Sequence, residues 1–231
     1  MPDLPRVFVG TLFSGEREYQ RCVDSVNVQR EVAVTHETIA HLPNREAHET
    51  LYQRFMSLRD DFDYFFKLDA DMQFLEPGAL AKIVAYFRSR PGLDHLQLTV
   101  HDFYTDASVF GVHCYSSRCS WDALPESLFV DPFPSIPGER SVYRAQSTSD
   151  NLVCHAFDQR EQDAYAFGCH KVSKIIQAGL QCPDINQMQS HWNNINKLSD
   201  AWLEHADPVR LRALQGAHDS IVCLLYTSDA A

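Results

Sequence analysis

The first hundred residues alternate between short apolar runs and stretches with helical periodicity. Residues 6–11, 32–35 and 61–68 are rich in β-branched and aromatic side chains, which predicts three strands. Between those runs, apolar positions recur at helical spacing over residues 16–29 and 41–60. A strand, a helix and a second strand in succession predict parallel pairing through a right-handed crossover. The pattern therefore predicts an α/β fold with a Rossmann-like, mostly parallel central sheet flanked by helices.

The rest of the chain is less regular. Residues 93–100 and 109–115 are predicted to be strands, and residues 150–156 a short strand. Residues 116–147 between them are predicted to be an irregular loop. The two longer strands can pair at a mixed edge of the sheet. The irregular segment is rich in proline and aromatic residues, and it is either an acceptor-binding loop or a cover over the sheet. A helix is expected to begin close to His170, and residues 188–218 are expected to be mainly helical.

Two aspartates follow the third predicted strand directly. Asp69 and Asp71 are one residue apart, and in an extended chain such side chains lie on the same face. A helical pattern begins after residues 76–78, so both are expected at the carboxyl end of a strand, where open α/β sheets bind their ligands. Paired carboxylates favour Mg²⁺ or Mn²⁺, which keep positions for water and substrate phosphates. Aspartates with this spacing also occur by chance in turns. Lys67 is expected on the opposite face, with a structural role.

Composition narrows the class of partner. The chain has 231 residues, with 20 basic and 31 acidic side chains and a net charge of −11, which argues against a nucleic-acid partner. No apolar stretch reaches the roughly 20 residues of a membrane helix, and the start shows no secretory signal. We therefore expect a cytoplasmic protein without a transmembrane segment. A peripheral position at the inner membrane face stays open as an alternative.

The strand at residues 7–11, the helix that contains residues 22–26, and the run Lys67-Leu68-Asp69-Ala70-Asp71 together resemble a GT-A type glycosyltransferase of the family 2 kind. The resemblance covers roughly the first hundred residues. It implies the GT-A nucleotide-diphospho-sugar transferase fold. It also implies transfer of a sugar, with inversion, from a nucleotide-diphosphate donor to a hydroxyl on a glycan or lipid-linked acceptor.

The resemblance also implies roles for particular residues. The loop after the first strand would hold the nucleotide, which corresponds here to Thr11 and Leu12. The end of the second strand would contact the base or ribose, which corresponds to His36 or Glu37, although the usual acidic pair is absent there. Asp69 and Asp71 would bind Mn²⁺ or Mg²⁺ and, through the metal, the donor diphosphate.

Two further roles are less closely fixed by the pattern. The segment Phe167-Gly168-Cys169-His170-Lys171 resembles a late histidine motif, which makes His170 a third metal ligand or a donor to the diphosphate; His155 is a poorer candidate. The base that accepts the proton of the acceptor hydroxyl is expected to be Asp150. Other carboxylates stay open for this role: Asp102, Asp122 and Asp131.

We expect one catalytic domain over residues 1–222. Its parts are the nucleotide-sugar half, the acceptor half and a helical C-terminal part: residues 1–100, 101–185 and 186–222. Residues 223–231 resemble translated adapter sequence and are expected to be a non-native tail. A non-catalytic domain that binds nucleotide sugars, or a nucleotidyltransferase, are the alternative functions.

Overall fold

The computed structural model describes residues 4–124, 134–135, 143–144, 152–181 and 185–228. The chain forms two compact units. The first comprises residues 1–101, 108–126 and 132–157. The second comprises residues 102–107, 127–131 and 158–231. The expectation of one catalytic domain over residues 1–222 stays a prediction.

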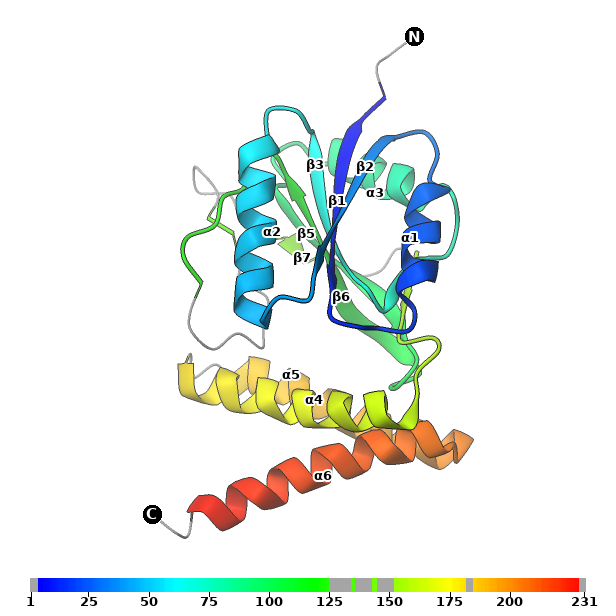
Figure 1. The fold of residues 1–231 in the computed structure, drawn as a ribbon, viewed down its shortest axis with the longest axis vertical. Coiled ribbons are helices and arrows are strands. Elements are labelled where there is room, and N and C mark those ends of the chain that lie inside the picture. The colour runs from blue at the N-terminus through cyan, green and yellow to red at the C-terminus, as the bar shows by residue number, and fades with distance from the viewer. Residues whose placement is uncertain (1–3, 125–133, 136–142, 145–151, 182–184, 229–231) are drawn as a thin grey trace. The chain divides into compact units, whose positions relative to one another are not determined.

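The first unit contains a mixed sheet with helices on both faces (Figure 1). Its strands are β1 (Arg6–Phe13), β2 (Ala33–Ala40), β3 (Tyr64–Asp69), β4 (Met72–Phe74), β5 (His95–Asp102), β6 (Ala107–Ser116), β7 (Tyr143–Arg144) and β8 (Val153–His155). Its helices are α1 (Tyr19–Asn27), α2 (Asn44–Leu58) and α3 (Ala79–Arg88). The α/β class is therefore confirmed.

The sheet has the strand order β2-β1-β3-β6-β5-β8-β4, and β7 pairs with β5. β1 is parallel to both β2 and β3, whereas β6 is antiparallel to β3 and β4 is antiparallel to β8. The expected parallel pairing thus holds for β2, β1 and β3, and beyond β3 the sheet is mixed. β5 and β7 are also parallel, so the antiparallel pairs of β6 with β3 and of β8 with β4 are what make the sheet mixed.

Apolar side chains bury both faces of β1 and β3. On one face, Val9 and Phe66 belong to a core shared with α1 and α3. On the other face, the Phe65 ring stacks on Phe55 of α2 with 4.2 Å between centroids. Because these strands are covered on both sides, their sequence is continuously apolar rather than alternating. The carboxyl ends of three parallel strands are thereby held at one edge of a rigid layer.

The second unit consists mainly of three helices, α4 (Glu161–Gln181), α5 (Ile185–His205) and α6 (Pro208–Ser228). Arg210 of α6 is buried and donates hydrogen bonds from its guanidinium to the carbonyl oxygens of Phe103 and Tyr104. The Tyr104 ring stacks on Phe167 of α4 with 3.8 Å between centroids. Residues 102–107 are therefore packed against the helices of this unit.

One sequence expectation about α4 is wrong. The helix begins at Glu161, so His170 lies in its interior and not near its start. The first turn carries Glu161 and Asp163, which are favourable at a helix amino end because they face the positive end of the helix dipole. These polar residues lack the apolar spacing that signals a helix, so the pattern alone placed the start too late.

His191 of α5 gives the second unit a pH-dependent stability. Burial, with Lys174 and Lys171 nearby, lowers the pKa of His191 from 6.5 to about 4. The unfolded chain therefore binds more protons between these values, so stability is complete above about pH 6.5 and falls as the pH drops toward 4. We expect His191→Leu to reduce this loss, as measured by urea unfolding at pH 7 and pH 4.5. His218→Leu, at an exposed position of α6, is the control, and an equal effect of both variants would contradict the prediction.

Candidate functional site

Asp69 and Asp71 lie at the carboxyl edge of the parallel strands. Asp69 is the last residue of β3, and Asp71 belongs to the turn that leads into β4. The expectation that both lie on one extended strand was therefore wrong for Asp71, because the chain turns after Asp69. Their side chains are 37% and 25% exposed, so both carboxylates are partly accessible to solvent.

Lys67 lies beside Asp69 and not on the opposite face. Its Nζ is 2.8 Å from Asp69 Oδ1, and its side chain is only 4% exposed. The sequence expectation was wrong because residues two apart on a strand share a face. Lys67 is thus a buried cation that holds one oxygen of the first aspartate.

His155 of β8 pairs with the second aspartate. Its Nε2 is 3.2 Å from Asp71 Oδ2, and the backbone N–H of Ala156 donates to Asp71 O. The antiparallel pairing of β4 with β8 produces this contact. The sequence analysis ranked His155 below His170, because the short strand at residues 150–156 was predicted but its partner β4 was not.

Metal binding by Asp69 and Asp71 stays a prediction, and the structure adds the ion pair of Asp71 with His155. Two ligands on one ion are about 3 Å apart when bonds of about 2.1 Å meet at right angles. The separation of Asp71 Oδ2 and His155 Nε2 matches that spacing. Carboxylate oxygens suit both ions, and the imidazole nitrogen suits Mn²⁺ better than Mg²⁺. Asp71 and His155 are the two side chains close enough to share an ion, and Asp69 does not form a group of three ligand atoms with them.

Thr11 and Leu12 lie on β1 in different environments. Leu12 stands opposite Asp69 in the parallel pairing of β1 with β3. The Thr11 side chain is fully buried, and its Oγ1 is 2.9 Å from Nε2 of His36. Burial lowers the pKa of His36, which favours a neutral ring. Leu12 is therefore beside Asp69, whereas the Thr11 hydroxyl is buried against the His36 ring.

The residues expected at the end of the second strand lie within it. β2 continues to Ala40, so His36 and Glu37 are interior positions. Glu37 forms an ion pair with Arg54 of α2 at 2.7 Å, and this hydrogen-bonded pair lowers the pKa of the carboxyl group. A role of Glu37 in base or ribose binding stays a prediction.

The carboxylates considered for the catalytic base lie in different surroundings, and two of them lie outside the described residues. Asp150 and Asp131 lie outside the described residues. Asp102 is buried and accepts hydrogen bonds from the backbone N–H and hydroxyl of Thr105, so it stabilises a turn. Asp122 is exposed and accepts a hydrogen bond from Ser135.

His170, the expected third metal ligand, belongs to the second unit. Its side chain is partly buried within α4. Its assignment as a metal ligand stays a prediction.

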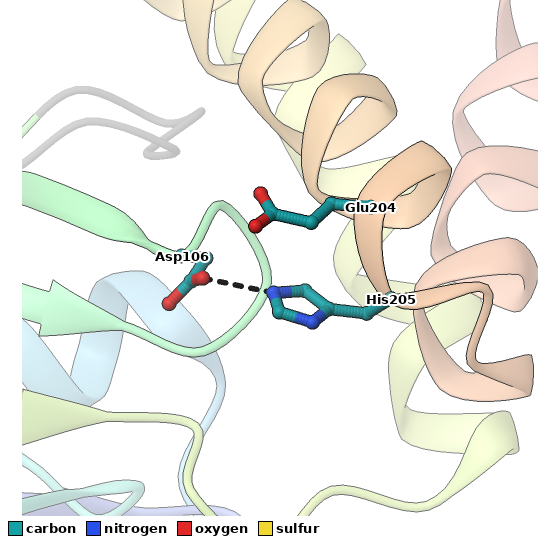
Figure 2. Close-up of side chains that lie close together, drawn as sticks. All are labelled: Asp106, Glu204 and His205. Atoms are coloured by element: carbon teal, nitrogen blue, oxygen red, sulfur yellow. Dashed lines mark hydrogen bonds and ion pairs between the residues drawn. The ribbon is translucent and has the colours of Figure 1, made fainter.

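The second unit also contains a group of side chains that could hold a cation. Figure 2 shows Asp106, Glu204 and His205, whose ligand atoms lie within 4.8 Å of one another. Among the described residues, this is the one such group of three or more histidine, cysteine or acidic side chains. All three are exposed, and His205 Nε2 is 2.9 Å from Asp106 Oδ2. This ion pair accounts for the arrangement without a metal.

The ion pair between Lys67 and Asp69 is expected to contribute to the stability of the folded chain. Asp69→Asn removes the negative charge from a nearly buried ammonium group, so we expect the free energy of unfolding to fall by about 1 kcal/mol. Urea unfolding measures this change. Asp61→Asn, in an exposed turn before β3, should leave stability unchanged. Equal stability of both variants would show that the ion pair contributes nothing.

Comparisons with known proteins add little. No family model and no curated protein matches the chain. Among solved structures, the chain is similar to one titled "Crystal Structure of A197 from STIV", with 16% sequence identity and a TM-score of 0.31. The similarity covers 42% of this chain and 47% of that chain, so this chain spans about half the length of that structure. A similarity this weak carries no argument about function.

None of the described helices combines the length and apolar character required to cross a membrane.

Proposed function

We propose that the chain is a metal-dependent glycosyltransferase of the GT-A type, which moves a sugar from a nucleotide-diphosphate donor to a hydroxyl acceptor with inversion. The observation that carries this proposal is the acidic pair at the carboxyl edge of β3, with His155 against Asp71. The acceptor we propose is a glycan or a lipid-linked sugar.

The position of the aspartates supports this proposal. Ligands of open α/β sheets bind outside the carboxyl ends of parallel strands, and the carboxyl end of β3 lies between β1 and β6 in the sheet. Leu12, expected near the nucleotide, is directly beside Asp69. A nucleotide placed along β1 would therefore bring its diphosphate to the two carboxylates.

Negative charge develops on the departing nucleoside diphosphate during sugar transfer, and this charge must be stabilised. A bound Mn²⁺ or Mg²⁺ supplies that stabilisation as a Lewis acid. Asp71 and His155 would offer an oxygen and a nitrogen to the ion, and Lys67 fixes the position of the Asp69 carboxylate. The acceptor oxygen forms a bond to the anomeric carbon as the bond from that carbon to the diphosphate breaks. A carboxylate takes the hydroxyl proton, and Asp150 is the residue we assign to that step.

Release of nucleoside diphosphate from a panel of nucleotide sugars tests this proposal. The wild-type chain is assayed with Mn²⁺ and with a chelator, and we expect metal-dependent release from one or a few donors. Metal-dependent binding without release would favour a non-catalytic nucleotide-sugar-binding domain. Pyrophosphate release from a nucleoside triphosphate and a sugar phosphate would instead show a nucleotidyltransferase.

A further inference from the structure

Two buried histidines join neighbouring strands of the first unit. His95 is the first residue of β5 and His113 lies in β6, and these two strands are adjacent in the sheet. The residues are 0% and 4% exposed. His95 Nε2 is 3.0 Å from His113 Nδ1, which is a hydrogen-bond distance. One ring nitrogen therefore donates its proton, and the facing nitrogen accepts it through a lone pair.

Uncharged side chains hold the two rings in place. The ring of Tyr115 stacks on His95 with 4.7 Å between centroids. The amide nitrogen of Gln97 is 3.3 Å from His113 Nε2. An amide nitrogen donates, so Nε2 of His113 accepts and its Nδ1 carries the proton that is donated to His95. This arrangement requires a neutral His113 ring, because a protonated imidazole has no lone pair.

The charged groups near the pair make added positive charge costly. Lys67 of β3 stands opposite His113, and its side chain is only 4% exposed. Two carboxylates at neighbouring positions have cationic partners, since Asp69 pairs with Lys67 and Asp94 pairs with Arg118. A further basic residue, Arg144 of β7, stands opposite Gln97 in the pairing with β5. A proton on the histidine pair would thus be a buried charge close to an ammonium group, and both burial and repulsion disfavour it.

We propose that the pair of His95 and His113 is an acid-sensitive lock between β5 and β6, which opens when both rings are protonated. Two protonated rings have no lone pair on their facing nitrogens, so the hydrogen bond between them is lost. Two adjacent buried cations also repel each other. The inference goes beyond the proposed function, because it requires neither a metal ion nor a substrate.

The lock makes the stability of the first unit depend on pH. Histidines of an unfolded chain have a pKa of about 6.5, so both rings bind protons below that value once the chain unfolds. The folded pair binds at most one proton while the hydrogen bond is intact. The unfolded state therefore binds more protons, and stability is complete above about pH 6.5 and falls as the pH decreases.

The pH dependence of urea unfolding tests the lock. The wild type is compared with the double variant His95→Gln, His113→Gln. Between pH 5.5 and pH 4.5 the two unfolded histidines bind about two protons, against at most one in the folded chain. We therefore expect the unfolding constant of the wild type to rise about eightfold or more relative to that of the variant. Equal pH dependence of the two chains would overturn the inference.

The fluorescence of Trp121 reports on the correct unit. This residue is 7% exposed, and its ring contacts Tyr115 with 4.9 Å between centroids. All chains carry Trp192→Phe and Trp202→Phe, which remove the two tryptophans of α5. Contributions of other histidines, His191 among them, are the same in both chains and cancel in the comparison.

The control makes the same chemical change at two exposed histidines. His41→Gln and His218→Gln are combined in one chain. Its unfolding constant should change with pH as that of the wild type does. A loss of pH dependence in this control equal to that in the double variant would show that the effect does not belong to the buried pair, and would overturn the inference.

A measurement on the wild type alone covers the case in which the double variant does not fold. The nitrogen chemical shifts of the imidazole rings distinguish neutral from protonated histidine. As the pH is lowered, we expect at least one ring of the pair to stay neutral for as long as the spectrum of the folded first unit persists. A folded chain in which His95 and His113 are both protonated would overturn the inference.

Discussion

Asp71→Asn is expected to lower metal-dependent release of nucleoside diphosphate by roughly 10²–10³-fold, the size of effect seen when one group that stabilises developing charge is lost. Asp71 faces His155 at 3.2 Å, so its carboxylate is the side chain best placed to share an ion with a neighbouring ligand. An asparagine keeps the size of the side chain and removes its charge. Initial rates at saturating Mn²⁺, with the donor that the wild type prefers, measure the effect.

The matched control for this prediction is Asp61→Asn. Asp61 lies in an exposed turn before β3, so the variant makes the same chemical change away from the carboxyl edge. Its rate should equal that of the wild type. If Asp71→Asn releases the diphosphate as fast as Asp61→Asn does, Asp71 has no part in the reaction.

Gly168→Ala is expected to destabilise the packing of α4 against α6. An added Cβ would lie 1.9 Å from the carbonyl oxygen of Ala213, a backbone atom that cannot move without shifting α6. Overpacking of this kind typically costs about 1–3 kcal/mol. Alanine stabilises the interior of a helix by about 1 kcal/mol relative to glycine. We expect the steric cost at Gly168 to exceed this gain, because the atom in the way belongs to the backbone. Thermal unfolding measures the change, and a clear fall in Tm is the expected result.

Gly78→Ala is the control for that substitution. Gly78 precedes α3, and an added Cβ there would meet no atom within 4 Å. Gly78 is the N-cap of α3, where alanine is less favourable than glycine, so the Tm of Gly78→Ala should fall slightly and by much less than that of Gly168→Ala. A Gly168→Ala chain as stable as Gly78→Ala would show that the two helices are not in close contact at this position.

The sequence predicted the elements whose pattern is long enough to reveal a period. The helical spacing through Leu51 and Phe55 gave α2, and the spacing through Leu80 and Ile83 gave α3. β4 has three residues, Met72–Phe74, which is too short to show alternation. Its pairing with β8 depends on residues about eighty positions away in the sequence. Such pairing is decided by tertiary packing and not by local preference.

The candidate site was predictable only where its residues are neighbours in sequence. Asp69 and Asp71 stand out because two charges end an apolar run. His155 reaches Asp71 through β4, so it could be found only after the pairing of two short strands was known. Lys67 is different, since the alternation of side chains along β3 was sufficient to place it beside Asp69. In that case the signal was present in the sequence and was misread.

Binding of nucleoside diphosphates with and without Mn²⁺ tests the central claim most directly. Each of the common nucleoside diphosphates is titrated into the wild-type chain by calorimetry, first with Mn²⁺ and then with a chelator. A site in which the carboxylates of Asp69 and Asp71 face a diphosphate repels that ligand unless a cation lies between them. The account predicts binding of at least one nucleotide with Mn²⁺ and none with the chelator. Equal binding under both conditions, or none under either, would contradict it.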